Sequence, residues 1–455
     1  MTIQTINPAT GQQIKHYEPL GPQALEDTLT RAHTEFQNWR TTDLDQRQKR
    51  VHALAIIIED NTDKASNLMA LEMGKTFIAA QAEMEKCIKY CQYMADKTHE
   101  YLADAYVQTE YKKAFTRPLP LGPVLLVMPW NFPFWQVIRV AVPAILAGNT
   151  IVLKHASNVP QCALLLEKFF AMAGFSAGVF QTLLINAEQV DPVIRDDRIK
   201  AVSLTGSEAA GIAVAQACGK HIKKCVLELG GSDPFIVMPS ANIEAAIDAA
   251  LISRMRNNGQ SCIAAKRMIV HEDIYEQFRK GFLDKLNQLR IGDPLAPLTD
   301  IGPLSSAKAM RDIQAQIKTA TDDGAQLTTS TQPVPKNGYY QPPALLENIT
   351  ADMRIFHQEI FGPIAMFFKV RTFTEAINLA NDTPFGLSSV LFSNDQEEIE
   401  RAITDLEAGS TFVNRYASSD IRLPFGGSKR SGYGREMAKE GLREFTNLKT
   451  VIIAN

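Results

Sequence analysis

Short apolar runs rich in β-branched residues alternate with segments of helical composition, and this alternation constrains the fold of the chain more than any other feature. A first series lies between residues 122 and 229 and contains the runs GPVLLVMPW, NTIVLK, FQTLLI, AVSLT and CVLEL. Helical segments such as PQCALLLEKFFAMAG separate these runs. Runs this apolar suit strands that are buried on both faces, as in a parallel sheet covered by helices. The pattern predicts an α/β fold.

A second alternating series follows and predicts another α/β domain. Its expected strands are RMIVH, FGPIAMFFKV, SVLFS and STFVN, and its expected helices are EQFRKGFLDKLNQL and TEAINLAND. The chain has 455 residues, of which 45% are hydrophobic, and this is too long for one compact core. We therefore expect two or three domains.

Two segments lie outside these series. An apolar face follows Gly21-Pro22 at intervals of four and three residues, so we expect the chain to open with helices; the face comprises Leu25, Leu29, Ala32, Phe36 and Trp39. The stretch YVQTEYKKAFTRPLPLG and the terminal TVIIAN read as edge strands that pair with another subunit. An ordinary hairpin and a frayed tail fit the same periodicity equally well.

Charge and cysteine usage narrow the classes of partner. Lys and Arg number 47 against 50 Asp and Glu, and no run of like charge is long enough for a nucleic-acid backbone or an anionic membrane. The start MTIQTINPATG lacks the features of a signal peptide, and no apolar run approaches the ~20 residues of a membrane span. The six cysteines show no CxxC pair and no zinc spacing, and Cys87 and Cys91 are expected to be packed side chains. We expect a cytoplasmic protein without a metal, whose partners are small molecules and copies of itself.

Three residues are candidates for covalent chemistry. Cys262, in RNNGQSCIAAKR, follows a turn rich in Gly and Asn that can expose a thiol, although a lone cysteine is more often a core residue. Glu228, in VLELGGSDP, ends an expected strand, where ligand crevices of α/β sheets lie, and a buried carboxylate there can act as a general base. Asn131, in PWNFPFWQ, is an amide donor in a loop stiffened by proline, which suits an oxyanion.

A phosphate site is indicated by LTGSEAAG, where Thr205-Gly206-Ser207 joins a strand to a helical run. A helix N-terminus aimed from this turn would attract a phosphate. The segment is not a GxGxxG motif, and a capped helix start explains it equally well.

Several motifs together resemble the aldehyde dehydrogenase superfamily, in that family's order along nearly the whole chain: MPWNFPFWQ, NTIVLKHAS, LTGSEAAG, VLELGGSDPFIV, NNGQSCIAAKR, QEIFGPI and PFGGSKRSGYGRE. Cys262 follows Glu228 by 34 residues, as in the family pattern. The resemblance implies a Rossmann-like cofactor domain (1–105 and 121–228), an α/β catalytic domain (229–430) and a small β oligomerisation arm (106–120 and 431–455). It also implies a homodimer or homotetramer.

The resemblance further implies a mechanism. Cys262 attacks an aldehyde, Asn131 and the backbone N–H of Cys262 hold the oxyanion, hydride leaves for a nicotinamide, and Glu228 activates the water that cleaves the thioester. Family members that transfer the acyl group to coenzyme A generally lack a glutamate at this position, so Glu228 favours hydrolysis.

For the cofactor, the residues that match family contacts are Met128, Pro129, Trp130, Lys154, Ala156, Ser157, Gly206, Ser207, Leu229, Glu359 and Phe361. One of them departs from the pattern of members that prefer NAD, which commonly carry an acidic residue where this chain has Ser157. A carboxylate would repel a ribose 2′-phosphate, whereas a hydroxyl can donate to it while Lys154 supplies positive charge. We therefore expect a preference for NADP with some use of NAD.

For the substrate, the pattern is similar to bacterial family members that act on succinate semialdehyde. Arg139 matches the arginine that grips the distal carboxylate there, with Trp135, Ser261 and Ser419 as further contacts. A surface ion pair is the alternative for Arg139. Glutarate semialdehyde or a broad range of aldehydes are alternative substrates. A non-catalytic family member would be expected to lose some of Cys262, Glu228 and Asn131, and all three are present.

Overall fold

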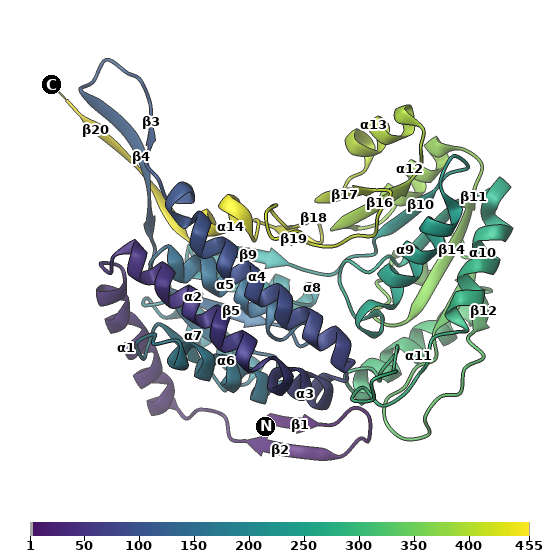
Figure 1. Ribbon diagram of the computed structural model, residues 1–455, viewed down its shortest axis with the longest axis horizontal. Helices are drawn as coiled ribbons and strands as arrows, with labels where there is room; N and C mark the ends of the chain where they lie inside the picture. Colours follow the sequence, from purple (N-terminus) through teal and green to yellow (C-terminus); the bar gives the residue numbers. More distant parts are fainter. Residues whose placement is uncertain (1–2, 455) are drawn as a thin grey trace.

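The structure is a computed structural model that describes residues 3–454 (Figure 1). The five runs of the first predicted series form five strands of a six-stranded sheet, and the sixth, β19, was not predicted. The strand order is β19-β9-β8-β5-β6-β7, and every neighbouring pair is parallel except β19 with β9. The strands are β5 (Pro123–Met128), β6 (Thr150–His155), β7 (Phe180–Thr182), β8 (Ala201–Thr205), β9 (Lys224–Glu228) and β19 (Gly432–Tyr433). The predicted parallel sheet is therefore confirmed, with one antiparallel edge.

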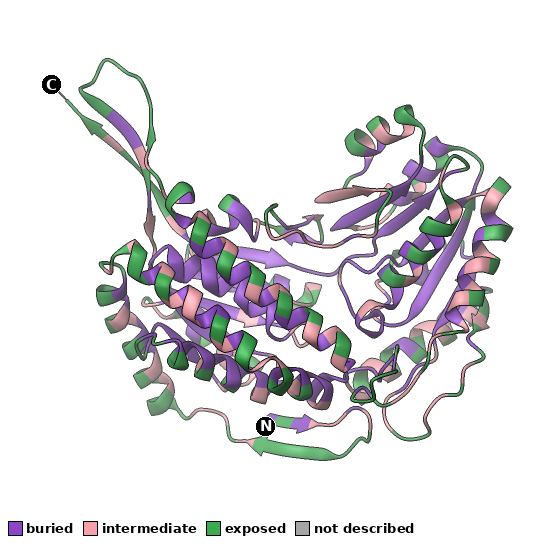
Figure 2. Cartoon of the chain, viewed as in Figure 1, coloured by how far each residue is buried: buried purple, intermediate pink, exposed green. Residues whose placement is uncertain are grey.

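Helices cover this sheet on both faces, as the apolar strands require. Alternate residues of β5 point to opposite sides: Val124 and Leu126 join the core cluster of α4 and α5, while Leu125 joins a second cluster that includes Val214 of α8. Figure 2 shows the resulting buried layer between exposed helix faces. The helices are α1 (Pro22–Trp39), α2 (Leu44–Asp60), α3 (Thr62–Met73), α4 (Phe77–Tyr101), α5 (Trp135–Leu146), α6 (Pro160–Met172), α7 (Val190–Arg195), α8 (Glu208–Lys220) and α14 (Ala438–Glu444).

The four strands predicted in the second series lie in a seven-stranded sheet in the other lobe of the molecule, with the order β12-β13-β14-β11-β10-β16-β17 (Figure 1). Strands β10, β12 and β13 were not predicted. Only the β12–β13 pair is antiparallel. The strands are β10 (Pro234–Val237), β11 (Arg267–His271), β12 (Gln326–Thr329), β13 (Ala344–Glu347), β14 (Ile364–Val370), β16 (Ser388–Phe392) and β17 (Ser410–Val413). The helices are α9 (Ile243–Met255), α10 (Glu272–Leu286), α11 (Ala307–Asp322), α12 (Phe373–Asn381) and α13 (Gln396–Asp405). A separate short pair joins β15 (Phe385–Gly386) to β18 (Ser428–Lys429).

The expectation that the chain opens with helices is wrong, because a β-hairpin precedes α1. Strand β1 (Ile3–Ile6) pairs antiparallel with β2 (Gln13–Tyr17). The turn between them contains Gly11 at φ +75°, a conformation that favours glycine. Only Ile3 and Thr5 of β1 are buried, so the alternation is too short to stand out in the sequence. Helix α1 itself follows as predicted.

Three strands form an arm that projects from the body (Figure 1). They are β3 (Ala105–Tyr106), β4 (Lys113–Pro120) and β20 (Thr446–Ile453). Strand β20 pairs antiparallel with β4 along its whole length, so both predicted segments form strands. Strand β4 is not an edge strand, because β3 pairs antiparallel with its other side and the two form the hairpin that was the alternative. The domain boundaries stay a prediction. Among the described residues, no helix has both the length and the apolar character that a membrane crossing requires.

Candidate active site

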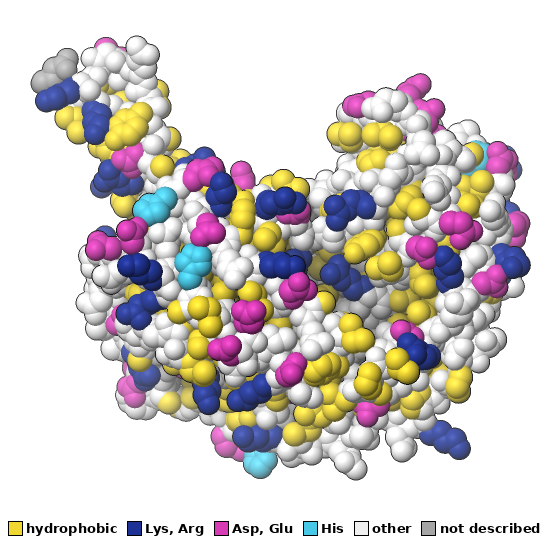
Figure 3. Space-filling model, viewed as in Figure 1, with side chains coloured by type: hydrophobic (Ala, Val, Ile, Leu, Met, Phe, Trp, Pro, Cys, Tyr) yellow, Lys and Arg dark blue, Asp and Glu magenta, His cyan; other side chains and the backbone are white. Residues whose placement is uncertain are grey.

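Cys262 lies between two cavities where the lobes meet, and Figure 3 shows the recess between the lobes, flanked by Lys and Arg side chains. The first cavity is lined by Pro129, Trp130, Asn131, Gln136, Thr205, Gly206, Ser207, Leu229, Gly230, Cys262, Glu359 and Phe361. The second cavity is lined by Lys75, Ala79, Ala82, Glu83, Lys86, Phe132, Trp135, Gln136, Arg139, Arg256, Asn257, Ser261, Cys262, Ile263, Ser419 and Phe425. The first cavity gathers most of the predicted cofactor residues, and the second gathers all four predicted substrate residues.

The turn before Cys262 is held by two asparagines with left-handed backbone conformations. Asn257 has φ +53° and Asn258 has φ +58°, a region that asparagine tolerates better than most residues. The Asn258 side-chain amide donates to the carbonyls of Gly74 (2.9 Å) and Pro303 (3.0 Å). The Asn257 amide donates to the carbonyl of Asn131 at 2.8 Å. These bonds fix the turn that carries the thiol relative to the Asn131 loop.

Asn131 lies directly after β5, in a loop that is anchored on both sides. Glu83 accepts hydrogen bonds from the N–H groups of Phe134 and Trp135, each at 2.9 Å, at the start of α5. The Asn131 amide donates one N–H to the Gln260 carbonyl at 3.2 Å, and its second N–H remains available. The backbone N–H of Cys262 enters no backbone hydrogen bond of residues 3–454. Two fixed donors are thus available near the thiol.

Glu228 is the last residue of β9 and is only 2% exposed. Neither carboxylate oxygen has a hydrogen-bond partner in the described part of the chain. Burial raises the pKa of Glu228 well above its usual range, Glu436 raises it further, and Arg139 lowers it. A carboxyl group with a raised pKa is a better proton acceptor, once ionised, than an ordinary glutamate.

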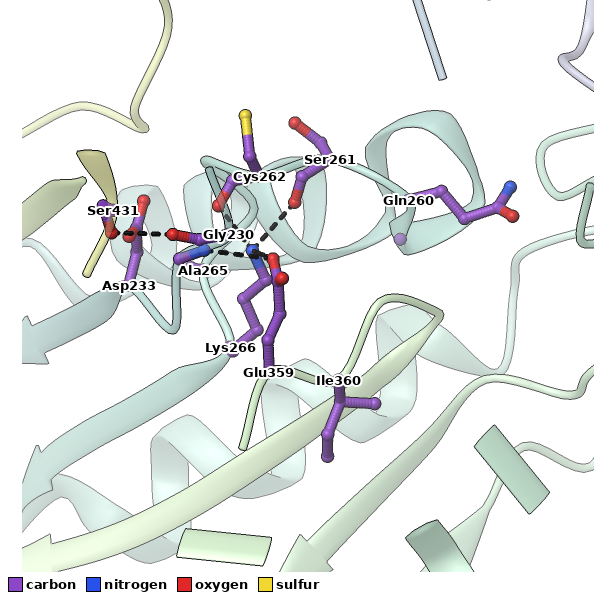
Figure 4. A network of polar contacts seen from close by, with 12 residues as sticks. Gly230, Asp233, Gln260, Ser261, Cys262, Ala265, Lys266, Glu359, Ile360 and Ser431 are labelled. Carbon is purple, nitrogen blue, oxygen red and sulfur yellow. Dashed lines mark hydrogen bonds and ion pairs between the residues drawn. The ribbon is translucent and has the colours of Figure 1, made fainter. Parts of the chain in front are cut away.

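No cation among the described residues bonds directly to the Cys262 thiol. Burial raises the pKa of Cys262 to about 12, against the opposing effects of Lys266 and Arg139. Lys266 donates to the Ser261 carbonyl (2.8 Å) and pairs with Glu359 (3.2 Å), while the sulfur points away from this network (Figure 4). At neutral pH the thiol therefore keeps its proton until a base removes it.

Arg139 occupies α5 at the second cavity and is 2% exposed. Its Nε forms a buried ion pair with Glu436, and its Nη2 lies 3.4 Å from the Thr205 hydroxyl. The alternative of a surface ion pair is therefore wrong, since the pair is buried beside the cavity. Glu436 stands at the end of the quoted PFGGSKRSGYGRE motif, but nothing in the sequence indicates its pairing with Arg139.

Two cations of the second cavity were missed by the sequence reasoning. Arg256 lies six residues before Cys262, and its closeness to the candidate nucleophile is a signal that could have found it. Lys86 belongs to α4, far from Cys262 in the sequence, and no local pattern identifies it as a site residue. Neither forms an ion pair within the part of the chain that the structure describes.

The remaining predicted cofactor residues lie at the ends of β5 and β6. Val127 pairs with Lys154 and Met128 with His155 in the parallel register, which brings the two strand ends together. Ser157 is exposed just beyond β6, Ala156 is half-buried and Met128 is buried. These residues extend from the first cavity along the carboxyl edge of the sheet, which is where ligands bind in such folds.

The known proteins that are similar to this chain agree in family and in the activity that their names give. The model of the aldehyde dehydrogenase family matches residues 1–451. The succinate-semialdehyde dehydrogenase [NADP(+)] of Mycobacterium leprae (strain TN) is 47% identical over 100% of both chains, and that of Mycobacterium ulcerans (strain Agy99) is 47% identical over 99% of both. A solved structure of succinic semialdehyde dehydrogenase from Streptococcus pyogenes in complex with NADP+ is 38% identical, with TM-score 0.97 and 100% coverage of both chains.

Proposed function

This chain belongs to the aldehyde dehydrogenase family, and we propose that it oxidises succinate semialdehyde to succinate with NADP as the hydride acceptor. The observation that carries the proposal is the position of Cys262 between two cavities, one with predicted cofactor residues and one with unpaired cations. The names and full-length similarity of the relatives support the substrate and the cofactor.

In the first step, Glu228 accepts the thiol proton and the sulfur of Cys262 bonds to the aldehyde carbon. The carbonyl oxygen becomes an oxyanion, which accepts hydrogen bonds from the Asn131 amide and the N–H of Cys262. Because both donors are held in place before the substrate arrives, little reorganisation opposes this step.

The first cavity suits a dinucleotide. Ser207 caps α8 by accepting from the N–H of Ala210 (3.4 Å), so the positive end of this helix faces the cavity. A Cβ atom at Gly230 would lie 2.4 Å from the Glu359 carboxylate, so glycine leaves room for Glu359 at this wall. The residues that would hold NADP are Pro129, Trp130, Gly206, Ser207, Leu229, Glu359 and Phe361, with Met128, Lys154, Ala156 and Ser157 along the sheet edge. When bound, NADP supplies the acceptor for a hydride.

Exchanging Ser157 for glutamate tests the cofactor assignment. A carboxylate beside Lys154 would repel a 2′-phosphate and accept hydrogen bonds from a free ribose. We expect Ser157→Glu to lower kcat/KM for NADP at least about 10-fold relative to that for NAD. Steady-state assays with both cofactors measure this ratio, and Ser157→Ala is the uncharged control. An unchanged preference in Ser157→Glu would refute the assignment.

Glu228 also accounts for release of the product. After oxidation the acyl group is bound to Cys262 as a thioester. Glu228 first releases the thiol proton to solvent and then accepts a proton from a water molecule whose oxygen attacks the thioester carbon. The C–S bond breaks, the thiol regains a proton and succinate is released. Hydrolysis rather than transfer to coenzyme A follows from this base in the site.

The second cavity suits an aldehyde that carries a distal carboxylate. Arg256 and Lys86 line it without ion pairs among the described residues, and Ser261 and Ser419 lie beside them. Arg139 adds charge to the same cavity, although Glu436 already neutralises part of it. A carboxylate would compensate these cations, whereas a neutral aldehyde would leave them unpaired.

Replacing Arg256 distinguishes its role in substrate binding from that of Arg139. We expect Arg256→Met to raise KM for succinate semialdehyde roughly 10- to 100-fold, with little change for butanal, because a charge-assisted hydrogen bond is lost. Arg139→Met is expected to impair both aldehydes, because it leaves Glu436 unpaired and raises the pKa of Glu228 further. Steady-state kinetics with both aldehydes provide the comparison. Equal effects of Arg256→Met on the two aldehydes would contradict its role.

The predicted homodimer or homotetramer is also part of the proposal. The arm exposes Tyr106, Val107, Leu448 and Ile452, and apolar strands of this kind are usually covered by a partner. The cytoplasmic location expected from the sequence stays a prediction.

A further inference from the structure

Lys86 reaches the second cavity from α4 and contacts two other segments there. Its ammonium group lies 4.3 Å from the centre of the Trp135 ring on α5. It donates to the Ser419 backbone carbonyl at 2.7 Å and also contacts the Ser419 hydroxyl oxygen. An ammonium group has three N–H donors, so one remains for a ligand in the cavity.

The charge of Lys86, like that of Arg256, has no carboxylate partner among the described residues, whereas two other cations of the cavity are paired. In the same cavity Lys75 is paired with Glu83, and Arg139 with Glu436. Burial, followed by repulsion from Arg256 and Arg139, lowers the pKa of Lys86 to about 7. A bound anion would reverse this effect, because it compensates the buried charge.

Lys86 also determines whether the Ser419 hydroxyl donates or accepts a hydrogen bond in the cavity. The Ser419 hydroxyl oxygen accepts from the ammonium group, so its own proton is available to a different acceptor. A carboxylate in the cavity can use both this proton and the third N–H of Lys86.

We propose that Lys86 is a specificity-determining residue that binds the distal carboxylate of the aldehyde directly and through the Ser419 hydroxyl that it positions. The inference rests on the proposed function, since it assumes an aldehyde that carries a carboxylate. It adds a residue of α4 to the recognition of that group.

The test is the ratio of kcat/KM for succinate semialdehyde to that for butanal, measured from pH 6 to pH 9. Both aldehydes use Cys262 and Glu228, so the titration of these groups cancels in the ratio. Among the groups that face Lys86, Asp420 has its pKa lowered to about 2 by Arg422, burial raises the pKa of Cys87 well above its usual range, and burial lowers the pKa of Arg256. Arg139 also faces Lys86 and is paired with Glu436. The ratio should therefore fall in the wild-type protein as Lys86 loses its proton.

Two substitutions at Lys86 give opposite expectations. Lys86→Met keeps an apolar side chain over Trp135 but no charge, and we expect a ratio that is roughly 10- to 100-fold lower and independent of pH. Lys86→Arg stays charged, so its ratio should remain high up to pH 9. Lys89→Met is the matched control, because Lys89 is exposed on the same helix and pairs with Glu85; it should behave like the wild type.

The possible outcomes distinguish failure of the proposed function from failure of the proposed role of Lys86. A wild-type ratio near one would overturn the proposed function. A large wild-type ratio with the same pH dependence in Lys86→Met would overturn the role of Lys86 and leave the proposed function intact.

Discussion

Cys262→Ala is expected to lower turnover of succinate semialdehyde by at least about 10³-fold, because no other nucleophile among the described residues lines both cavities. The variant should still fold and bind NADP, since the Cys262 side chain makes no hydrogen bond among the described residues. Loss of activity with retained binding, measured by reduced-cofactor absorbance and by nucleotide titration, would assign the defect to chemistry.

Cys225→Ser is the control for this substitution. Cys225 is the other cysteine that is not fully buried, and its sulfur lies 2.9 Å from the Tyr433 hydroxyl, a contact that serine can keep. Cys225→Ser should retain activity. Full activity in Cys262→Ala, or an equal loss in both variants, would contradict the assignment of the nucleophile.

Glu228→Gln is expected to lower turnover about 10²- to 10⁴-fold, the usual contribution of a general base. Glutamine has nearly the same shape but cannot accept the proton of the thiol or of water. Acylation can still proceed slowly through the small fraction of thiolate, whereas hydrolysis of the thioester lacks a base, so the acyl group should remain on Cys262. Mass spectrometry of the intact variant after incubation with aldehyde and NADP should show one added succinyl group.

The pH dependence gives a second readout of Glu228. Its pKa is raised by burial, so the proton-accepting carboxylate form is populated only as the pH rises through that value. Wild-type turnover should therefore increase with pH as Glu228 loses its proton. This increase forms the acidic limb of the pH profile. The limb should be absent in Glu228→Gln. A variant that turns over normally, without any adduct and with the same limb, would exclude Glu228 as the base.

Local patterns in the sequence were sufficient for the strands and helices that build the site. Glu228 ends a strand as predicted, and the Asn131 loop follows β5, because these positions depend on runs of apolar residues and on the turns after them. The hairpin β1–β2 was missed, because its four-residue strand buries only alternate side chains and depends on contacts with the folded body.

The charge pairing within the site could not be predicted. Arg139 meets Glu436, and Lys86 meets Ser419, across long stretches of chain that only the tertiary fold brings together. Whether a cation is neutralised or available to a substrate depends on such partners. For this reason the sequence indicated Arg139 as the carboxylate ligand, whereas the structure adds two unpaired cations, Arg256 and Lys86, to the same cavity.

The most direct test of the account is the reduction of NADP by the purified protein with succinate semialdehyde and, separately, with butanal. We expect rapid formation of the reduced cofactor with succinate semialdehyde and a kcat/KM at least about 10-fold higher than with butanal, because the unpaired cations recognise the carboxylate. Equal values for the two aldehydes, or no reduction of NADP with succinate semialdehyde, would contradict it.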